Sequence, residues 1–534
     1  SQSRQRLDPF SVKSLCLAAL PQAERIDYTG KNVTKSNGNN MSKFGLDPYA
    51  TIGLTENPFV VHALSADETG ERLLVGRDDD IHLVAQRLHK HGKITCLDGH
   101  VGVGKTSLVN VAAYKCYKAY LAGETPQLLI PSVVSFQLKK DGNIDEFCAE
   151  VFRGVAQTLL KYAAELRQFE LSASLSLPQL NAWLNSPIVQ HLNENGGAGL
   201  NIGIPGVAQL RVNGGAATNS QVNQSSGFSQ SGFESLIRQL LNEIFAVQGN
   251  GGVVCVIDNI ELLETAISAR RTLEALRDKL FTVNGLRWVF CGANGVIHSL
   301  AASPRLTAFL STPVIDVKNI NPSKIPELIR TRLTEFSSDA SKAEDLLPVD
   351  LDDLKHLYFL VNSNLRDLLG LADEYCEHYA TSGQPIRVRD RKREKFDKWL
   401  HKATVDRYQA LSSRISSNAW AVLDIAMSKQ FSGTFGAGDY ESFNKNSTVA
   451  FERSTFARWL RDLVKLGLLS KSIDEEQSDE DGFSRDVFTV TAKGALVQYA
   501  RRKKNENLSL AEPAAWMKRC LLYTSDAADD LLCV

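Results

Sequence analysis

The chain has 534 residues, of which 43% are hydrophobic and 23% are charged. This length allows about two to four domains with their own cores, and the composition is ordinary for a globular protein. The formal net charge of −1 excludes an overall basic character, so any surface that binds nucleic acid must be local. No apolar run approaches the roughly 18 residues that span a bilayer, which excludes a membrane-spanning helix and predicts no membrane partner.

The nine cysteines are scattered along the chain, and no two of them have the C-x-x-C spacing of a zinc or redox site. Cys96, Cys255 and Cys291 lie inside apolar runs, where we expect reduced thiols buried in a core. These features predict a cytoplasmic protein.

The two ends have unusual compositions. The first methionine is Met41, and the preceding segment 1–40 is interpreted as a disordered leader or as upstream translation. The segment 506–534 is expected to be a tail, and its last 15 residues, CLLYTSDAADDLLCV, resemble translated adapter DNA. Both segments are left out of the predicted fold.

Between about residues 73 and 317 the sequence alternates short β-rich runs with amphipathic helical stretches, which is typical of a parallel α/β sheet. We assign this pattern to one domain, 41–320. Its segment 196–233 is rich in Gly, Asn, Ser and Gln, and we expect a flexible insertion there. The predicted strands are 93–98, 132–138, 252–258, 286–292 and 313–317.

The stretch GHVGVGKT follows the first predicted strand and matches the pattern G-x-x-x-x-G-K-[ST] in full. In this pattern glycines let successive backbone N–H groups point at phosphate oxygens, and the following helix adds its positive end. Lys105 then reaches the β- and γ-phosphates, and the Thr106 hydroxyl ligates Mg²⁺. A plain tight turn is the alternative, but the flanking strand and helix favour a phosphate loop. The expected nucleotide-binding residues here are Gly99, His100, Val101, Gly102, Val103, Gly104, Lys105, Thr106 and Ser107.

The stretch VVCVIDNIE is a buried strand that ends in Asp258 and resembles a Walker B motif. There the aspartate binds Mg²⁺ through water, and the next residue is usually a catalytic glutamate. That position is Asn259, whose amide cannot take a proton from water. Glu261 is the nearest candidate for the general base, with Glu264 behind it, although Glu261 could equally begin a helix as an acidic first-turn residue. The pattern predicts nucleotide binding with weak or slow hydrolysis.

Two further regions follow the sheet domain. Apolar residues recur at helical spacing through 321–382, which predicts a small all-helical domain. The segment 383–411 contains the basic run RVRDRKREK from residue 387 onward and is expected to be a linker helix. Its basic residues could track phosphates, or they could simply form a solvated helix face.

The segment 412–505 is predicted to be a winged helix-turn-helix domain. Apolar residues at helical spacing within 452–472 predict a helix with one buried face. The acidic stretch DEEQSDEDG separates two strand-like runs, as the tip of a hairpin would. The other face of this helix could enter the major groove of double-stranded DNA. The acidic tip would repel the DNA backbone, so docking to a protein partner is the alternative. The stripe is Phe456, Trp459, Leu460, Leu463 and Val464, and the candidate DNA-binding residues are Arg453, Arg458, Arg461 and Lys465.

Taken together, these motifs resemble the AAA+ ATPases, specifically the branch of origin-recognition-type initiators. VGRDDD, with Gly76 and Arg77, is similar to the box that lies near the adenine in these proteins. The resemblance implies that Asn294 occupies the sensor 1 position and that Arg305 is an arginine finger acting on a neighbouring subunit. It also implies that Arg366, in NSNLRDLL, is the sensor 2 arginine on a lid helix.

The resemblance implies a P-loop sheet between helices, then a helical lid and a winged helix. It implies ATP and Mg²⁺ as cofactors, assembly into a homo-oligomer through the ATP sites, and catalytic roles for Lys105, Glu261, Asn294, Arg305 and Arg366. The function it favours is an ATPase that switches conformation or assembly in association with DNA. Asn259 and the insertion are also compatible with the STAND-type signalling ATPases, in which ATP is a switch and the winged helix binds protein. A metabolic kinase would leave the lid and the winged helix unexplained.

Overall fold

The structure is a computed structural model of the whole chain. It describes residues 48–505 apart from positions 52, 141, 167–179, 182–229, 248–250, 264–265, 294, 302, 338, 340–341, 383–388, 429, 432, 448–449 and 475–484. Several sequence expectations therefore lie outside the described residues: the leader 1–40, residues 196–229 of the insertion, the acidic tip 475–481, the tail 506–534, Glu264 and Asn294.

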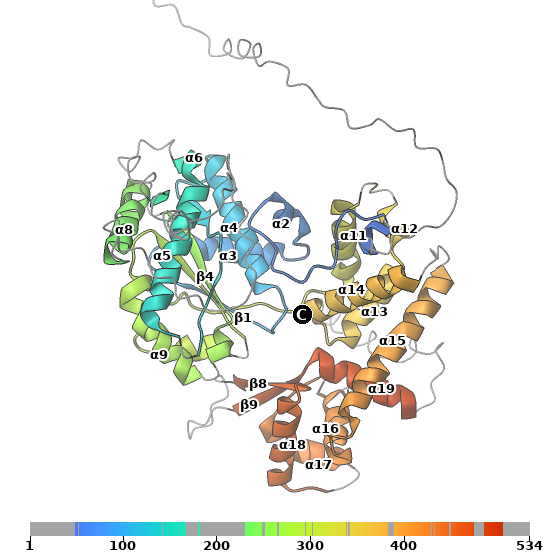
Figure 1. The fold of residues 1–534 in the computed structure, drawn as a ribbon. Coiled ribbons are helices and arrows are strands. Elements are labelled where there is room, and N and C mark those ends of the chain that lie inside the picture. The colour runs from blue at the N-terminus through green and yellow to red at the C-terminus, as the bar shows by residue number, and fades with distance from the viewer. Residues whose placement is uncertain are drawn as a thin grey trace, which may run out of the picture. The chain divides into compact units, whose positions relative to one another are not determined.

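A parallel sheet forms the centre of the first domain, in the strand order β2-β4-β5-β1-β6, with β3 also paired to β4 (Figure 1). The expected parallel α/β sheet is thereby confirmed. Strand β5 lies between β1, which leads into the glycine-rich loop, and β4, which ends at Asp258. The strands are β1 Thr95–Asp98, β2 Leu129–Pro131, β3 Phe136–Gln137, β4 Gly252–Asp258, β5 Leu286–Cys291 and β6 Ile315–Asp316.

Helices cover both faces of this sheet, so the central strands β4 and β5 are largely buried and consist mainly of apolar residues. Along β4, Val254 and Val256 pack with α3 and α4, whereas Cys255 and Ile257 pack with α5, α8 and α9, because successive side chains point to opposite faces. Residues 230–233, the end of the expected insertion, lie in α8. The helices of this domain are α2 Glu68–Leu73, α3 Asp78–Leu88, α4 Lys105–Leu121, α5 Ile144–Lys161, α6 Ala163–Leu166, α8 Gln230–Val247, η3 Ile260–Leu263, α9 Ala266–Leu276, η4 Arg277–Phe281 and α10 Val296–Ala301.

The strand predicted over 132–138 is instead two short strands, β2 and β3, on either side of the segment 132–135. The backbone N–H of Val133 donates to the Thr158 hydroxyl of α5 at 3.2 Å, so it does not join a strand ladder. The side chains of Val133 and Val134 are also partly exposed, 38% each. The prediction of one continuous strand was wrong because a contact with a distant helix interrupts the pairing.

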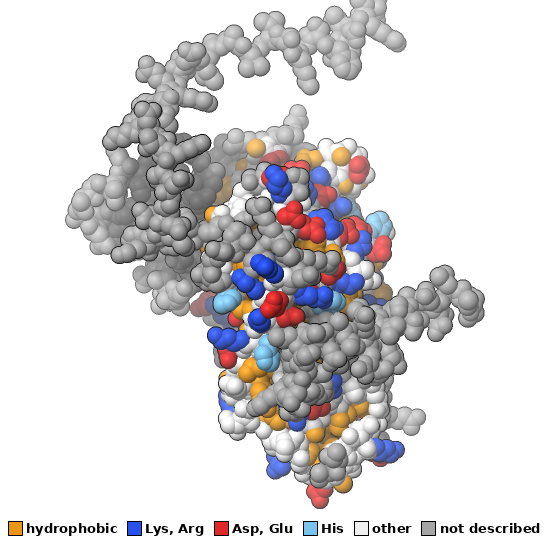
Figure 2. Space-filling view, turned by 90° about the vertical axis from the view of Figure 1, so that its right-hand side faces the viewer, with side chains coloured by type: hydrophobic (Ala, Val, Ile, Leu, Met, Phe, Trp, Pro, Cys, Tyr) orange, Lys and Arg blue, Asp and Glu red, His pale blue; other side chains and the backbone are white. Residues whose placement is uncertain are grey.

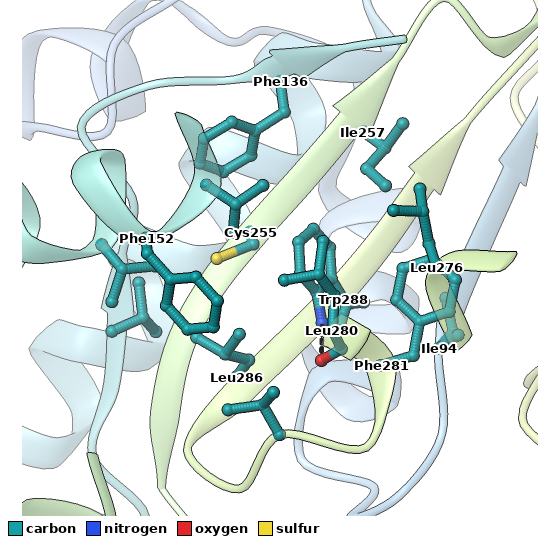
Figure 3. Close-up of a cluster of buried hydrophobic side chains, with 14 of the residues drawn as sticks. Ile94, Phe136, Phe152, Cys255, Ile257, Leu276, Leu280, Phe281, Leu286 and Trp288 are labelled. Atoms are coloured by element: carbon teal, nitrogen blue, oxygen red, sulfur yellow. Dashed lines mark hydrogen bonds between the residues drawn. The ribbon is translucent and has the colours of Figure 1, made fainter. Parts of the chain in front are cut away.

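The core between the sheet and α5, α8 and α9 is rich in aromatic side chains (Figure 3). Trp288 of β5 is 2% exposed and meets Phe281 edge-on, with ring centroids 5.4 Å apart. Its indole N–H donates to the Leu280 carbonyl at 3.2 Å, so the buried polar atom is satisfied.

We expect Trp288→Ala to lower the free energy of unfolding by about 3–5 kcal/mol, because it leaves a cavity in this core. Urea unfolding followed by circular dichroism measures the change. Ile267→Ala on α9 is the control: its side chain is 63% exposed, and its effect should stay within about 0.5 kcal/mol. Equal effects of the two substitutions would contradict the packing described here.

The second body is all helical and has its own core (Figure 1). The short segment 48–59 packs here: Tyr49, Leu54 and Phe59 are buried in the core that the helices of this body form. This segment thus joins the helical body, while the chain after residue 64 builds the sheet domain. The elements are α1 Pro48–Thr51, η5 Pro322–Lys324, α11 Ile325–Glu335, α12 Ala343–Leu346, α13 Leu351–Leu360, α14 Leu365–Ser382 and α15 Arg389–Ser412.

The basic linker forms most of α15. On the face of the molecule that Figure 2 shows, basic and acidic side chains are interspersed. On α15, Arg393 pairs with Asp353 at 3.3 Å and Arg407 pairs with Glu374 at 2.7 Å. These ion pairs favour the interpretation of α15 as a solvated helix face rather than as a track for phosphates.

The C-terminal elements have the order helix, strand, helix, helix, strand, strand, with an antiparallel sheet in the order β7-β9-β8. This is the order expected for a winged helix-turn-helix. Phe456, Trp459, Leu460 and Leu463 of α18 are buried in the core of this body, as the apolar stripe predicts. The elements are α16 Ser417–Ala426, β7 Thr434–Gly436, η6 Ala437–Asp439, α17 Tyr440–Asn446, α18 Arg453–Lys465, β8 Leu469–Asp474, β9 Arg485–Val490 and α19 Ala492–Asn505.

Within the described part of the chain, no helix combines the length and the apolar character needed to cross a membrane.

Candidate nucleotide-binding site

The glycine-rich loop joins the carboxyl end of a central strand to the start of a helix, since β1 ends at Asp98 and α4 begins at Lys105. Gly102 and Gly104 have φ values of +85° and +95°, a left-handed conformation that favours glycine. No heavy atom lies within 4 Å of the position that a Cβ of Gly104 would take. A loop of this kind at a helix N-terminus is an anion-binding arrangement, because its N–H groups and the helix dipole both favour negative charge.

Lys105 brings a positive charge into this loop. Its side chain is largely buried, with 7% of the residue exposed. The ammonium group donates to the backbone carbonyls of Gly99 at 2.9 Å and His100 at 3.1 Å. Burial, together with the charge of Lys105, lowers the pKa of His100, so the imidazole adds no second charge at neutral pH. The cation of the loop is therefore Lys105.

Thr106 and Asp258 meet at the end of the sheet. The Thr106 hydroxyl donates to Asp258 Oδ2 at 2.5 Å, and the other oxygen of this carboxylate accepts from the Asn259 N–H at 2.9 Å. A hydroxyl and a carboxylate are oxygen ligands of the kind that Mg²⁺ prefers, and Mg²⁺ usually keeps several waters besides one or two carboxylates. The donor set therefore fits the magnesium site that the motifs predict.

Two side chains after Asp258 bear on proton transfer. Asn259 lines the pocket and has a φ of +57°, a conformation that asparagine tolerates better than most residues. Glu261 lies in η3, where burial raises the pKa of its carboxyl while the charge of Lys105 lowers it. Its Oε2 is buried and has no hydrogen-bond partner among the described residues. Glu261 thus has one carboxylate oxygen without a hydrogen-bond partner among the described residues. Its side chain does not line the pocket.

The helical domain closes over the loop at the start of α14. A Cβ on Gly102 would stand 2.7 Å from Asn364 Oδ1 and 3.0 Å from Arg366 Cβ, so only glycine allows this approach. The amide of Asn364 donates to the Val101 carbonyl at 3.0 Å. Arg366 is exposed and lines the pocket together with the loop. The sequence singled out Arg366; Asn364 lies in the same stretch, NSNLRDLL, but no role was expected for it.

These elements surround one pocket, with about 620 Å³ of space that includes open solvent. Loop residues, Asp258 and Arg366, which are far apart in sequence, come together here. The pocket has a further wall that the sequence did not predict, formed by the segment 60–63 and by Arg332 of α11. The lining residues are Val60, Val61, His62, Ala63, Val101, Gly102, Gly104, Lys105, Thr106, Ser107, Asp258, Asn259, Arg332, Leu365, Arg366 and Leu369.

Gly76 and Arg77 do not line the pocket. Arg77 is 6% exposed, and its guanidinium donates to the Val103 carbonyl at 3.0 Å and to Asp80 at 2.9 Å. Gly76 has a φ of +73°, which turns the chain into α3. In this structure Arg77 braces the loop backbone.

Arg305 lies outside the pocket lining, with its side chain 72% exposed and 3.9 Å from Glu274. It is therefore free to reach another molecule, and it takes no part in this chain's own pocket. The buried Asp98, at the end of β1, accepts from the N–H groups of Gly295 at 3.4 Å and Ile297 at 3.2 Å. The segment that follows β5, which contains the expected sensor position, is thereby tied to the strand that leads into the loop.

A parallel sheet between helices, with this loop after a central strand, is the α/β fold of P-loop NTPases. No family model matches the chain, and no curated protein matches it in sequence.

The chain is similar to several solved structures. The chain is similar to the Aeropyrum pernix ORC1 protein in complex with DNA, with 13% identity and a TM-score of 0.37 over 80% of this chain and 92% of that chain. It is similar to the Aeropyrum pernix ORC2 protein in ADPNP–ADP complexes, with 12% identity and a TM-score of 0.40 over 85% and 100%. It is also similar to Cdc6p from Pyrobaculum aerophilum, with 14% identity and a TM-score of 0.33 over 85% of this chain and 99% of that chain.

These neighbours belong to the class of origin-recognition-type proteins that the sequence motifs resemble. The scores and identities are low, so the chemistry of the site rests on this chain's own residues.

Proposed function

We propose that the chain is an ATPase that binds ATP with Mg²⁺ and uses the nucleotide state to switch its conformation and assembly in association with double-stranded DNA. The observation that carries this proposal is the single pocket in which the loop, Asp258 and Arg366 converge from two separately packed bodies. The loop N–H groups and Arg366 suit a ligand that carries several phosphates.

Each group has a role in this proposal. Lys105 and the loop N–H groups bind the phosphates, and Thr106 and Asp258 hold Mg²⁺. The metal ion neutralises charge that develops on the phosphate oxygens. Glu261 accepts the proton of the attacking water, in place of the glutamate that Asn259 replaces. Hydrolysis is slow because this carboxylate stands outside the pocket lining.

The lid contacts support a switch. Arg366 and Asn364 reach the loop from α14, so a bound γ-phosphate would favour the closed arrangement of the two bodies. Two residues before Asn364, the amide of Asn362 donates to the Val490 carbonyl at the end of β9, at 2.7 Å. The turn 362–364 thus contacts both the loop and the winged helix, which supports transmission between them. Arg305, exposed and outside the pocket, is our candidate for contact with a neighbouring subunit.

The proposed DNA contact is the exposed face of α18, opposite its buried stripe. Arg453, Arg458, Arg461 and Lys465 are all exposed there. Arginine side chains on the second helix of a helix-turn-helix are suited to contact guanine edges and phosphates in the major groove. The alternative is that this face docks a protein partner.

We expect the double substitution Arg458→Ala and Arg461→Ala to weaken binding of the full chain to duplex DNA about tenfold or more, and to reduce the salt slope by about two. Fluorescence anisotropy with ATP, with ADP and without nucleotide, over a salt series, measures both quantities. The control is Arg330→Ala with Lys342→Ala, which removes two exposed charges from the helical body instead.

Affinity that changes with nucleotide in the wild-type chain is expected. If the wild-type chain binds no duplex under any of these conditions, the DNA contact is wrong, and a protein partner of α18 takes its place. If the control weakens binding as much as the α18 variant, the contact is not on α18.

A further inference from the structure

The wall of the pocket formed by residues 60–63 is a strap between two bodies. On one side, the N–H of Leu64 donates to the Ser107 hydroxyl at 3.0 Å, and Asn110 donates to the Leu64 carbonyl at 2.8 Å. Both partners belong to α4, the helix that follows the phosphate loop. The strap is therefore fixed to the loop helix at its C-terminal end.

At its other end the strap is held by one side chain of the helical body. Arg332 of α11 donates through Nη1 to the carbonyls of Pro58 at 3.0 Å and Val60 at 3.1 Å. Phe59, between these two residues, is fully buried in the core of the helical body. The strap thus begins where Arg332 grips the backbone.

Arg332 is an unusual group to find in this position. It is 5% exposed and lines the pocket, and burial lowers the pKa of its guanidinium to about 10. Its Nε is buried without a hydrogen-bond partner among the described residues. Burying a cation against backbone carbonyls alone costs free energy, and a leucine or methionine would fill the same space without that cost. Such a residue points to a role in the site.

The strap differs in chemistry from the phosphate end of the pocket. Val60 and Val61 are each 41% exposed, and with Ala63 they make this wall largely apolar, while His62 adds an exposed imidazole to it. Lys105, Thr106 and Asp258 supply the charge at the other part of the lining. A largely apolar wall favours contact with the flat ring of a base, whereas a glycine loop with a lysine favours phosphates.

We propose that Arg332 is a positioning residue for the nucleoside: it holds the strap 60–63 in place, and the strap contacts the base and ribose. This inference rests on the proposed nucleotide site, and it assigns the nucleoside to the strap and the phosphates to the loop. Because the strap is tied to α4 at one end and to α11 at the other, nucleoside binding and the position of the helical body depend on each other. Phosphate binding does not require Arg332.

The test compares two probes on the full chain, ATP and inorganic tripolyphosphate, each with Mg²⁺, by isothermal titration calorimetry. We expect Arg332→Met, which keeps the bulk of the side chain, to weaken ATP binding about tenfold and to change tripolyphosphate binding less than about twofold. Arg332→Lys, which retains a donor, should recover part of the loss. Arg330→Met is the matched control, because Arg330 lies on the same helix but is 55% exposed and pairs with Glu344.

Three results would overturn the inference. Unchanged ATP affinity in Arg332→Met would show that ATP binding does not depend on the contact of Arg332 with the strap. An equal loss for both probes would show a general structural defect, which the melting curve of the variant would confirm. A wild-type chain that binds tripolyphosphate as tightly as ATP would show that no nucleoside contact exists. Failure of the wild-type chain to bind either probe would instead refute the proposed nucleotide site itself.

Discussion

Replacing Lys105 with alanine is expected to weaken ATP binding by about 100-fold, which is the largest effect on ATP affinity that we expect from a single substitution in the site. Lys105 is the one lysine that lines the pocket in the described part of the chain, and its ammonium is already largely desolvated. Removing a buried cation that hydrogen-bonds an anion costs about 2–5 kcal/mol, and about 2.7 kcal/mol corresponds to 100-fold. Calorimetry with ATP and Mg²⁺ on the full chain measures the loss.

Lys93→Ala is the matched control. Lys93 precedes β1 at the opposite end of the strand, where its ammonium is exposed and donates to the Ala308 carbonyl at 2.6 Å. Its removal should leave ATP affinity unchanged. If Lys105→Ala binds ATP as the wild-type chain does, the loop does not hold the phosphates and the proposed site is wrong.

Replacing Glu261 with glutamine is expected to lower the rate of ATP hydrolysis about 10²–10⁴-fold while leaving ATP affinity nearly unchanged. The substitution removes the proton acceptor but preserves the size of the side chain. Phosphate release under saturating ATP measures the rate, and Glu327→Gln on α11, an exposed carboxylate that pairs with Lys324, is the control. A rate that is unaffected in Glu261→Gln would assign the base to another group.

The pH dependence gives an independent test of the same role. Burial raises the pKa of Glu261 above its ordinary value of 4.5. Because a base acts only when it is deprotonated, kcat should fall as the pH is lowered through this raised pKa. The fall should be absent from the residual activity of Glu261→Gln. A wild-type profile that is flat down to pH 4.5 would contradict the assignment.

The sheet and the phosphate end of the site could be predicted because they depend on local patterns. The run GVVCVID is apolar up to its final aspartate, as is typical of a strand covered on both faces, and β4 has the predicted bounds. The glycines of the loop are required by the left-handed conformations of Gly102 and Gly104. Asp258 follows directly from its place at the end of that strand.

The opposite wall of the pocket could not be predicted in this way. Arg332 and Asn364 act on backbone carbonyls of residues more than 200 positions away in sequence, and a carbonyl has no residue type that a pattern could recognise. The interruption of the predicted strand 132–138 has a similar origin, since it depends on Thr158 in a later helix. A weak signal was present for Arg332, as an arginine on the otherwise buried face of a predicted helix.

The central claim is that one ATP molecule is bound between the phosphate loop and the helical body. Hydrogen exchange of the full chain, with and without ATP and Mg²⁺, tests it most directly. We expect slower exchange in three separate segments together, 99–108, 258–263 and 364–369, and no change in Lys105→Ala. Unchanged exchange in the wild-type chain, or protection of the loop without protection of 364–369, would contradict it.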